Sequence, residues 1–141
     1  MKKVLIVNSH YYKEITNNLV IAAKNILKRN KLSVSIINAP GIFEIPYTIR
    51  KNINKFDAFI AIGCVIKGQT PHFDLICKTV FDAILHISIK HNKPITNGII
   101  TALNKKQALE RSGNIKANKT NRGLEASKAI ISVLKNGTKK I

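Results

Sequence analysis

The sequence predicts a three-layer α/β/α sandwich built around a four-stranded parallel sheet, with residues 1–141 forming a single domain. Two observations lead to this fold class. Apolar runs of strand length alternate along the chain with segments in which apolar residues recur at helical spacing. The strand-like runs are apolar throughout, which is typical of parallel strands buried on both faces. Strict alternation of the two kinds of element implies parallel strands joined by right-handed crossovers.

The expected strands are the four apolar runs, at residues 4–7, 34–37, 58–62 and 95–101. We expect a first helix that ends at Asn30, and later helices over residues 47–52, 72–92, 105–112 and 123–136. This order is typical of flavodoxin-like folds, in which ligands bind beyond the carboxyl ends of the strands. The candidate site therefore lies in the loops at residues 8–12, 39–44, 64–72 and 101–104.

The charge of the chain is strongly unbalanced, with 24 Lys and Arg against 7 Asp and Glu and a formal net charge of +17. A basic nucleic-acid-binding module is the alternative from another functional class. It would need cations gathered on one face with aromatic residues between them. Here the cations are mostly Lys, they are scattered, and only 6% of the residues are aromatic. We therefore expect no nucleic-acid partner.

Cys64 and Cys77 are the only cysteines, and neither belongs to a Cys or His group at metal-ligand spacing. A reducing cytoplasm is the expected compartment, with no metal site. The longest apolar run, residues 58–66, is far shorter than the ~20 residues that span a bilayer. The first strand follows the initial Met almost directly, so we expect neither a signal peptide nor a membrane partner.

The loop at residues 63–74 has the composition of an anion site before a long helix. Thr70 is expected to cap that helix, with Pro71 in its first position. Gly68 allows close approach of a ligand, and the free amides at Gln69 and Thr70 favour an anion near the positive helix end. Lys67 adds a cation. The alternative is a well-capped helix with no ligand.

His72 stands in the first turn of the same helix, beside the expected anion site. An imidazole with an ordinary pKa of ~6.5 suits proton transfer near neutral pH. A surface histidine without a catalytic role is the alternative interpretation.

Three further features each have a functional and a structural interpretation. Residues 39–46 enclose Phe43 and Glu44 between prolines, which indicates either a rigid ligand wall or a capped turn over a buried ring. Tyr11 follows the first strand, where its ring could stack on a planar substrate or simply pack. Arg111 could bind phosphate through the paired N–H groups of its planar guanidinium, or it could be an ordinary solvated helix residue.

Taken together, these loops resemble the 6,7-dimethyl-8-ribityllumazine synthase family, which acts at the penultimate step of riboflavin synthesis. The motifs match in order and spacing over nearly the whole chain. They are PGIFEIP at 40–46, GCVIKGQTPHFD at 63–74, NGIIT at 97–101, QALER at 107–111 and NRGLEA at 121–126. Each motif alone is weak evidence for the family, but the five motifs together are specific for it.

The resemblance implies a transferase that needs no cofactor. It would condense 5-amino-6-(D-ribitylamino)uracil with 3,4-dihydroxy-2-butanone 4-phosphate through an imine, releasing phosphate, water and the lumazine. His72 would shuttle protons. The pyrimidine and its ribityl chain would contact Tyr11, Gly41, Ile42, Phe43, Glu44, Cys64, Val65, Ile66 and Asn97. The phosphate would be held by Lys67, Gly68, Gln69 and Thr70, and by Arg111 from an adjoining subunit.

The sequence departs from the family pattern at three positions. Lys67 stands where many members have Arg, Arg122 stands at a common Lys position, and Asn97 replaces an aromatic residue that many members place on the pyrimidine. Two alternatives to a working synthase are a flavin-binding protein without catalysis and a family member that has lost activity and is retained as an assembly.

The resemblance also implies a homo-oligomer with active sites between neighbouring subunits. We expect a pentamer rather than a 60-subunit capsid, because no N-terminal extension precedes the first strand and residues 112–121 form a long insert. Riboflavin synthase, which uses the product, is the candidate protein partner.

Overall fold

A computed structural model describes residues 1–113, 120–136 and 140–141 of the chain. It contains a four-stranded sheet in the order β2-β1-β3-β4, in which every neighbouring pair is parallel. The strands are β1 (Lys3–Ser9), β2 (Ser33–Ala39), β3 (Ala58–Ile66) and β4 (Ile95–Ala102). Each one covers a predicted apolar run and extends it, so the predicted sheet is confirmed.

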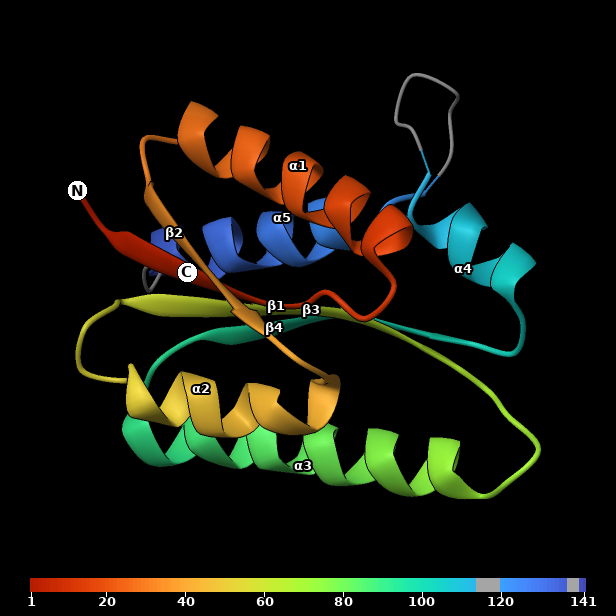
Figure 1. Ribbon diagram of the computed structural model, residues 1–141. Helices are drawn as coiled ribbons and strands as arrows, with labels where there is room; N and C mark the ends of the chain where they lie inside the picture. Colours follow the sequence, from red (N-terminus) through yellow and green to blue (C-terminus); the bar gives the residue numbers. More distant parts are fainter. Residues whose placement is uncertain (114–119, 137–139) are drawn as a thin grey trace.

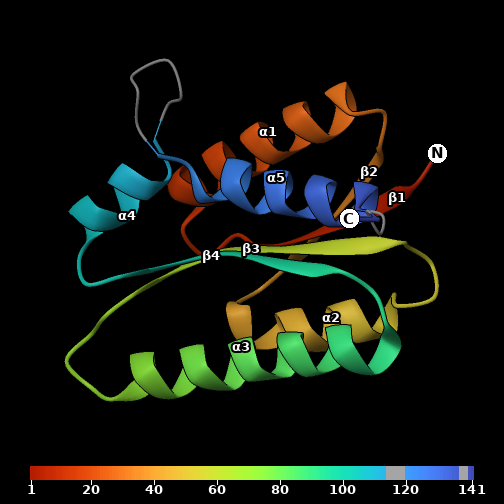
Figure 2. The same cartoon turned by 180° about the vertical axis from the view of Figure 1, so that it is seen from behind.

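Helices cover both faces of the sheet and complete the predicted three layers (Figures 1 and 2). One face carries α1 and α5, the other carries α2 and α3, and α4 lies beyond the end of the sheet. The helices are α1 (Lys13–Arg29), α2 (Ile45–Lys51), α3 (His72–His91), α4 (Lys105–Arg111) and α5 (Arg122–Lys135). A short 3-10 helix, η1 (Ile42–Glu44), precedes α2 and was not predicted. Within the described residues, no helix has the length and apolar character needed to cross a membrane.

The core divides into two clusters because successive strand residues point to opposite faces of the sheet. On β1, Val4 and Ile6 pack toward α1 and α5, whereas Leu5 and Val7 pack toward α2 and α3. All four side chains are fully buried. Burial of such a side chain contributes about 1.5–3 kcal/mol, so the doubly covered sheet accounts for much of the stability.

Two glycines allow close approaches that shape the fold. A Cβ at Gly123 would lie 2.2 Å from the carbonyl oxygen of Leu19, so α5 begins directly against the backbone of α1. A Cβ at Gly63 would lie 2.9 Å from Cγ2 of Ile42. The missing side chain on β3 therefore lets η1 seat against the sheet.

The predicted cap of the long helix is wrong. Helix α3 begins at His72, its capping residue is Pro71, and no side chain accepts a hydrogen bond from its first turn. Thr70 lies one residue before the capping position, which is occupied by Pro71. By contrast, Oδ1 of Asn104 caps α4 by accepting from the Gln107 amide at 2.9 Å, and Asn121 caps α5 in the same way.

Candidate active site

Three loops converge on one pocket at the carboxyl ends of β1 and β3, which we call the β1–β3 pocket. It has a volume of about 270 Å³. Seven of the residues expected in the site line it: Tyr11, Gly41, Ile42, Cys64, Val65, Ile66 and His72. The topology explains the convergence, because β1 is central and both η1 and β3 pass beside its end.

Tyr11 presents its ring at the mouth of this pocket. The side chain is 75% exposed, and its ring meets that of Tyr12 edge-on, with centroids 5.0 Å apart and an interplanar angle of 86°. Tyr12 is half-buried against the core, and burial raises the pKa of its phenol. Tyr12 therefore supports Tyr11 from behind, a relationship that the sequence analysis missed along with the lining residues Ser9 and Ile76.

His72 lies at the start of α3, where its imidazole is exposed and lines the β1–β3 pocket. None of the described residues hydrogen-bonds its ring. The imidazole is therefore free to exchange protons with a molecule in the pocket. The described residues contain no group of three His, Cys, Asp or Glu side chains that could hold a metal ion.

Cys64 forms part of the wall between the pocket and the core. Its side chain is only 5% exposed, and burial raises the pKa of the thiol to about 11. The thiol is therefore neutral near pH 7 and is a poor nucleophile, because the thiolate is the reactive form. Cys64 therefore lines the pocket as a largely buried, neutral side chain.

Phe43 and Glu44 lie in η1, next to the pocket but outside its lining. The Phe43 side chain is 63% exposed, so it is not the buried ring of a capped turn. The Glu44 carboxylate lies close to Gly41, since a Cβ on that glycine would be 3.2 Å from Oε1 of Glu44. The Thr48 hydroxyl donates to the Glu44 carbonyl at 2.8 Å and holds the turn. An acceptor thus stands at the rim of the pocket.

The expected anion loop, residues 67–70, is exposed and does not line the β1–β3 pocket. The Lys67 amide donates to the Ala102 carbonyl at 2.8 Å, which fixes the start of the loop to the end of β4. Apart from the glycine and its two chain neighbours, none of the described residues has an atom within 4 Å of a Cβ added at Gly68. The loop is therefore open to a ligand from outside.

Two other predicted residues lie in a second pocket of about 240 Å³ at the open edge of the sheet. We call this the β4-edge pocket. Arg111 reaches it from α4 and donates through Nη1 to the Thr101 carbonyl at 3.1 Å. Asn97 reaches it from β4 itself. The full lining is Phe81, Asn97, Ile99, Ile100, Thr101, Arg111 and Arg122. His72 and Arg111 are thus not brought into one pocket within this chain.

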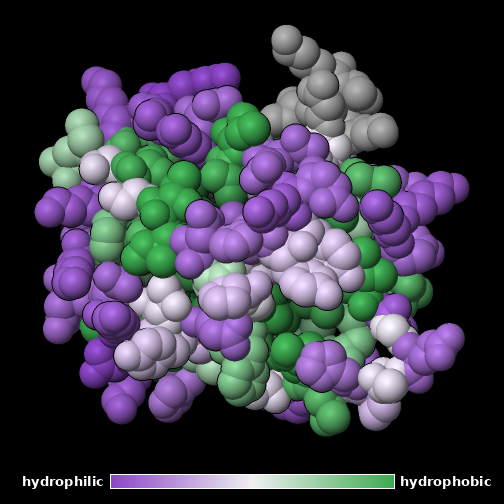
Figure 3. Space-filling view, viewed as in Figure 1, coloured by the Kyte–Doolittle hydropathy of each residue, from purple (hydrophilic) through white to green (hydrophobic). Residues whose placement is uncertain are grey.

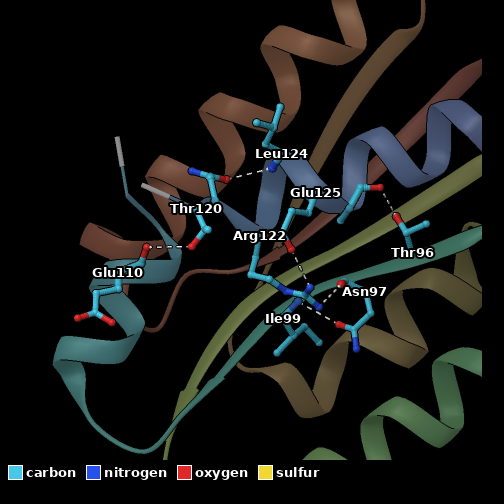
Figure 4. Close-up of polar contacts among 10 residues, drawn as sticks. Thr96, Asn97, Ile99, Glu110, Thr120, Arg122, Leu124 and Glu125 are labelled. Carbon is cyan, nitrogen blue, oxygen red and sulfur yellow. Dashed lines mark hydrogen bonds and ion pairs between the residues drawn. The ribbon is translucent and has the colours of Figure 1, made fainter. Parts of the chain in front are cut away.

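Arg122 is the main residue of the β4-edge pocket that the sequence analysis did not place in the site. It donates to the Asn97 carbonyl at 3.2 Å and pairs with Glu125 at 3.0 Å (Figure 4). A larger hollow of about 740 Å³ between α1 and α5 contains none of the predicted site residues.

Comparison with known proteins agrees with the motifs. The family model for 6,7-dimethyl-8-ribityllumazine synthase matches residues 1–137. A protein of that name from Campylobacter jejuni subsp. doylei is 39% identical over 94% of this chain and 87% of its own length. One from Aliarcobacter butzleri is 37% identical over 94% of this chain and 86% of its own length. A model match over nearly the whole chain, with relatives of this similarity, places the chain in the 6,7-dimethyl-8-ribityllumazine synthase family.

Proposed function

We propose that this family member is the transferase that condenses 5-amino-6-(D-ribitylamino)uracil with 3,4-dihydroxy-2-butanone 4-phosphate to give 6,7-dimethyl-8-ribityllumazine, phosphate and water. The observation that carries the proposal is the β1–β3 pocket, in which an exposed ring, a free imidazole and strand-end backbone converge. Each matches a demand of the reaction: a planar substrate, proton transfers, and hydrogen bonds to ring edges.

In this proposal the pyrimidine lies against Tyr11, and its ribityl chain runs toward η1. The Glu44 carboxylate accepts from ribityl hydroxyls, while the backbone of Val65 and Ile66 bounds the ring. The substrate amine attacks the ketone carbon, and His72 moves protons as water leaves to form the imine. Phosphate then departs, and ring closure releases a second water. The positioning of two substrates together supplies several kcal/mol of the rate.

The phosphate requires cations and amide donors, for which we propose Lys67, Gly68, Gln69 and Thr70 together with Arg111. Arg111 belongs to the β4-edge pocket, whereas the other four precede His72. A second copy of the chain that brings its β4 edge to the β1–β3 pocket would complete the set. The site we propose is therefore shared between subunits.

We propose a pentamer as the assembly, in preference to a 60-subunit capsid. Apolar side chains on α3 support subunit contacts, because Leu75, Leu85 and Ile89 are 65%, 60% and 72% exposed. Figure 3 likewise shows hydrophobic side chains at the surface among hydrophilic ones. Most of the insert expected to oppose a capsid, residues 114–119, lies outside the described residues. Light scattering tests the proposal, and a mass near sixty subunits would overturn it.

The cytoplasm is the compartment we propose, since Cys64 and Cys77 are both buried free thiols. Riboflavin synthase is the partner we propose for handing over the product. Co-sedimentation of the two purified proteins tests this, and separate sedimentation at working concentrations would contradict it.

The function is tested by mixing the purified protein with both substrates and following lumazine absorbance. An enzyme-free blank is the control, because the condensation also proceeds slowly without a catalyst. A rate well above the blank is expected. A rate equal to the blank, from folded and assembled protein, would instead indicate a family member that has lost catalytic activity. Visible absorbance of a bound flavin in the purified protein would favour the flavin-binding alternative.

A further inference from the structure

The hollow between α1 and α5 is an elongated groove away from the candidate site. Its volume of about 740 Å³ exceeds that of either site pocket, and it shares no lining residue with them. The two helices lie side by side in both ribbon views (Figures 1 and 2). Gly123 at the start of α5 meets Leu19, and Lys135 at its end donates to Oδ1 of Asn30 at 2.9 Å. The helices therefore run in the same direction.

One wall of the groove is a single face of α1. Six α1 residues line it, and they recur at the three- and four-residue intervals that place side chains on one side of a helix. They are Asn18, Ile21, Ala22, Asn25, Ile26 and Arg29. At 1.5 Å per residue this face runs for about 16 Å, which is the length of three helical turns. Leu124 and Lys128 of α5 form the opposite wall of what we call the α1–α5 groove.

The middle of the α1–α5 groove is apolar and leaves room for a large side chain. Ala22 is small and only 8% exposed, whereas Ile21 beside it is 57% exposed. Ile26, one turn further along α1, and Leu124 on α5 are half-buried. A short side chain among three longer ones leaves a depression, which suits a leucine-sized knob from a packed helix. None of the described lining residues is aromatic, so the groove offers no surface on which nucleic-acid bases could stack.

The charge of the α1–α5 groove is positive and uncompensated. Arg29 and Lys128 are exposed, and neither forms an ion pair with another of the described residues. Four Lys and Arg stand against one Glu on α1, and three against one on α5. The two carboxylates, Glu14 and Glu125, are already paired with cations at 3.6 Å and 3.0 Å. The groove therefore favours an acidic partner and disfavours a second copy of this chain, whose net charge is +17.

We propose that the α1–α5 groove is a docking surface for an acidic amphipathic helix of a partner protein. Apolar residues of that helix, spaced at i, i+3, i+4 and i+7, pack along Ile21, Ala22 and Leu124. Its flanking carboxylates lie beside Arg29 and Lys128. The groove remains open in the proposed assembly, because α1 and α5 cover the face of the sheet opposite α3, which we propose for subunit contacts (Figure 1).

The test is fluorescence anisotropy of the whole protein with a labelled synthetic helix of about four turns. This probe carries Leu at i, i+3, i+4 and i+7 and Glu and Ala elsewhere. One control peptide has the same composition in shuffled order, and a second has Lys in place of every Glu. Wild type is expected to bind the probe about tenfold or more tightly than either control, because only the probe matches both the apolar face and the cations.

Charge reversal in the groove separates specific docking from the general attraction of a basic protein. Arg29→Glu combined with Lys128→Glu should weaken probe binding by about tenfold and should transfer the preference to the Lys peptide. Lys24→Glu combined with Lys28→Glu is the matched control, because both lysines are exposed on α1 and neither lines the groove. That control should bind the probe within about twofold of wild type.

The apolar part of the contact is tested by Ile21→Ser, which should weaken probe binding by roughly tenfold at unchanged charge. Thermal unfolding of every variant verifies the fold. Lumazine formation is expected to match wild type in all of them, because no groove residue belongs to the proposed site. The docking inference and the proposed function therefore fail separately.

Absence of probe binding to wild type would overturn the inference, as would equal binding of the shuffled peptide. Equal losses in the two double variants would show a general charge effect and would also overturn it. A short DNA duplex provides the remaining comparison. If the duplex bound wild type and lost affinity only in the groove double variant, while the probe did not bind, the groove would belong to a nucleic acid instead.

Discussion

Nη2 of Arg122 donates to the main-chain carbonyl of Asn97 at 3.2 Å, and this bond ties the first turn of α5 to the open edge of the sheet. The same guanidinium pairs with Glu125 one turn further along the helix. A cation is thus held at the sheet edge by α5, while the imidazole of His72 stands free in the other pocket. The two pockets should therefore respond differently to substitution.

Replacement of His72 by Ala is expected to lower turnover by about 10²–10⁴-fold, the usual contribution of a general acid–base group. Stability should change by less than ~0.5 kcal/mol, because the side chain is exposed and has no hydrogen-bonding partner among the described residues. Steady-state rates and thermal unfolding measure the two effects. His86→Ala, an exposed histidine on the same helix, is the control. Unchanged turnover in His72→Ala would remove the proton-shuttle role.

Arg111→Ala is expected to raise the KM for the phosphorylated substrate about tenfold or more, because a charge-assisted hydrogen bond is lost. The KM for the pyrimidine should move much less. Steady-state titration of each substrate at saturation of the other separates the effects. Arg50→Ala, an exposed arginine on α2, controls for the loss of one positive charge. Equal effects on both substrates would refute the phosphate role.

Gly123→Ala is expected to destabilise the protein by about 1–3 kcal/mol through overpacking. Alanine favours a helix over glycine by ~1 kcal/mol. That gain is smaller than the cost of a Cβ placed 2.2 Å from the Leu19 carbonyl, which forces α5 away from α1. Chemical denaturation measures the difference. Gly68→Ala should leave the stability unchanged, because its new Cβ meets no described residue within 4 Å other than its chain neighbours. A Gly123→Ala protein as stable as wild type would contradict the close approach.

Buried Cys64 predicts a loss of stability at alkaline pH. Its pKa is raised to about 11 in the folded chain, against 9.0 for an unperturbed thiol. Above pH 9 the unfolded chain releases the thiol proton while the folded chain retains it. The contribution of Cys64 is thus complete below pH 9 and is lost as the pH rises toward 11. Denaturation of wild type and Cys64→Ala at pH 8, 9, 10 and 11 should show a flatter decline in the variant.

Alkylation offers an independent check on the same thiol. Iodoacetamide should leave Cys64 unmodified at pH 8 in the folded protein and should modify it once urea unfolds the chain. Rapid modification at pH 8 without urea would indicate an exposed or ionised thiol.

The strands could be predicted from the sequence because burial on both faces requires an apolar side chain at nearly every position. Val4 to Val7 is such a run, and it can be recognised without knowing which distant elements cover it. The 3-10 turn at Ile42 could not be predicted in this way. Its position depends on Gly63 of β3, which has no side chain and so leaves space for Ile42.

The residues of the candidate site likewise fall into those whose position could be predicted from the sequence and those whose position could not. His72 and Tyr11 could be placed in one pocket because both follow strands that a parallel sheet sets side by side. The separation of Arg111 from His72 could not be read from the order of the motifs, since it follows from β4 being the edge strand. Tyr12 was overlooked because its role depends on a ring-to-ring contact rather than on a motif.

The close contact between Gly123 and the Leu19 carbonyl has a consequence for folding during synthesis on the ribosome. Helix α1 leaves the ribosome early, and the surface that it buries against α5 remains uncovered until α5, near the other end of the chain, has emerged. Arg122 is carried on that later helix, so the β4-edge pocket gains its second arginine, after Arg111, only when α5 has emerged. A ribosome stalled after β4 would hold a β1–β3 pocket with all of its lining residues and no Arg122 to anchor the Asn97 carbonyl.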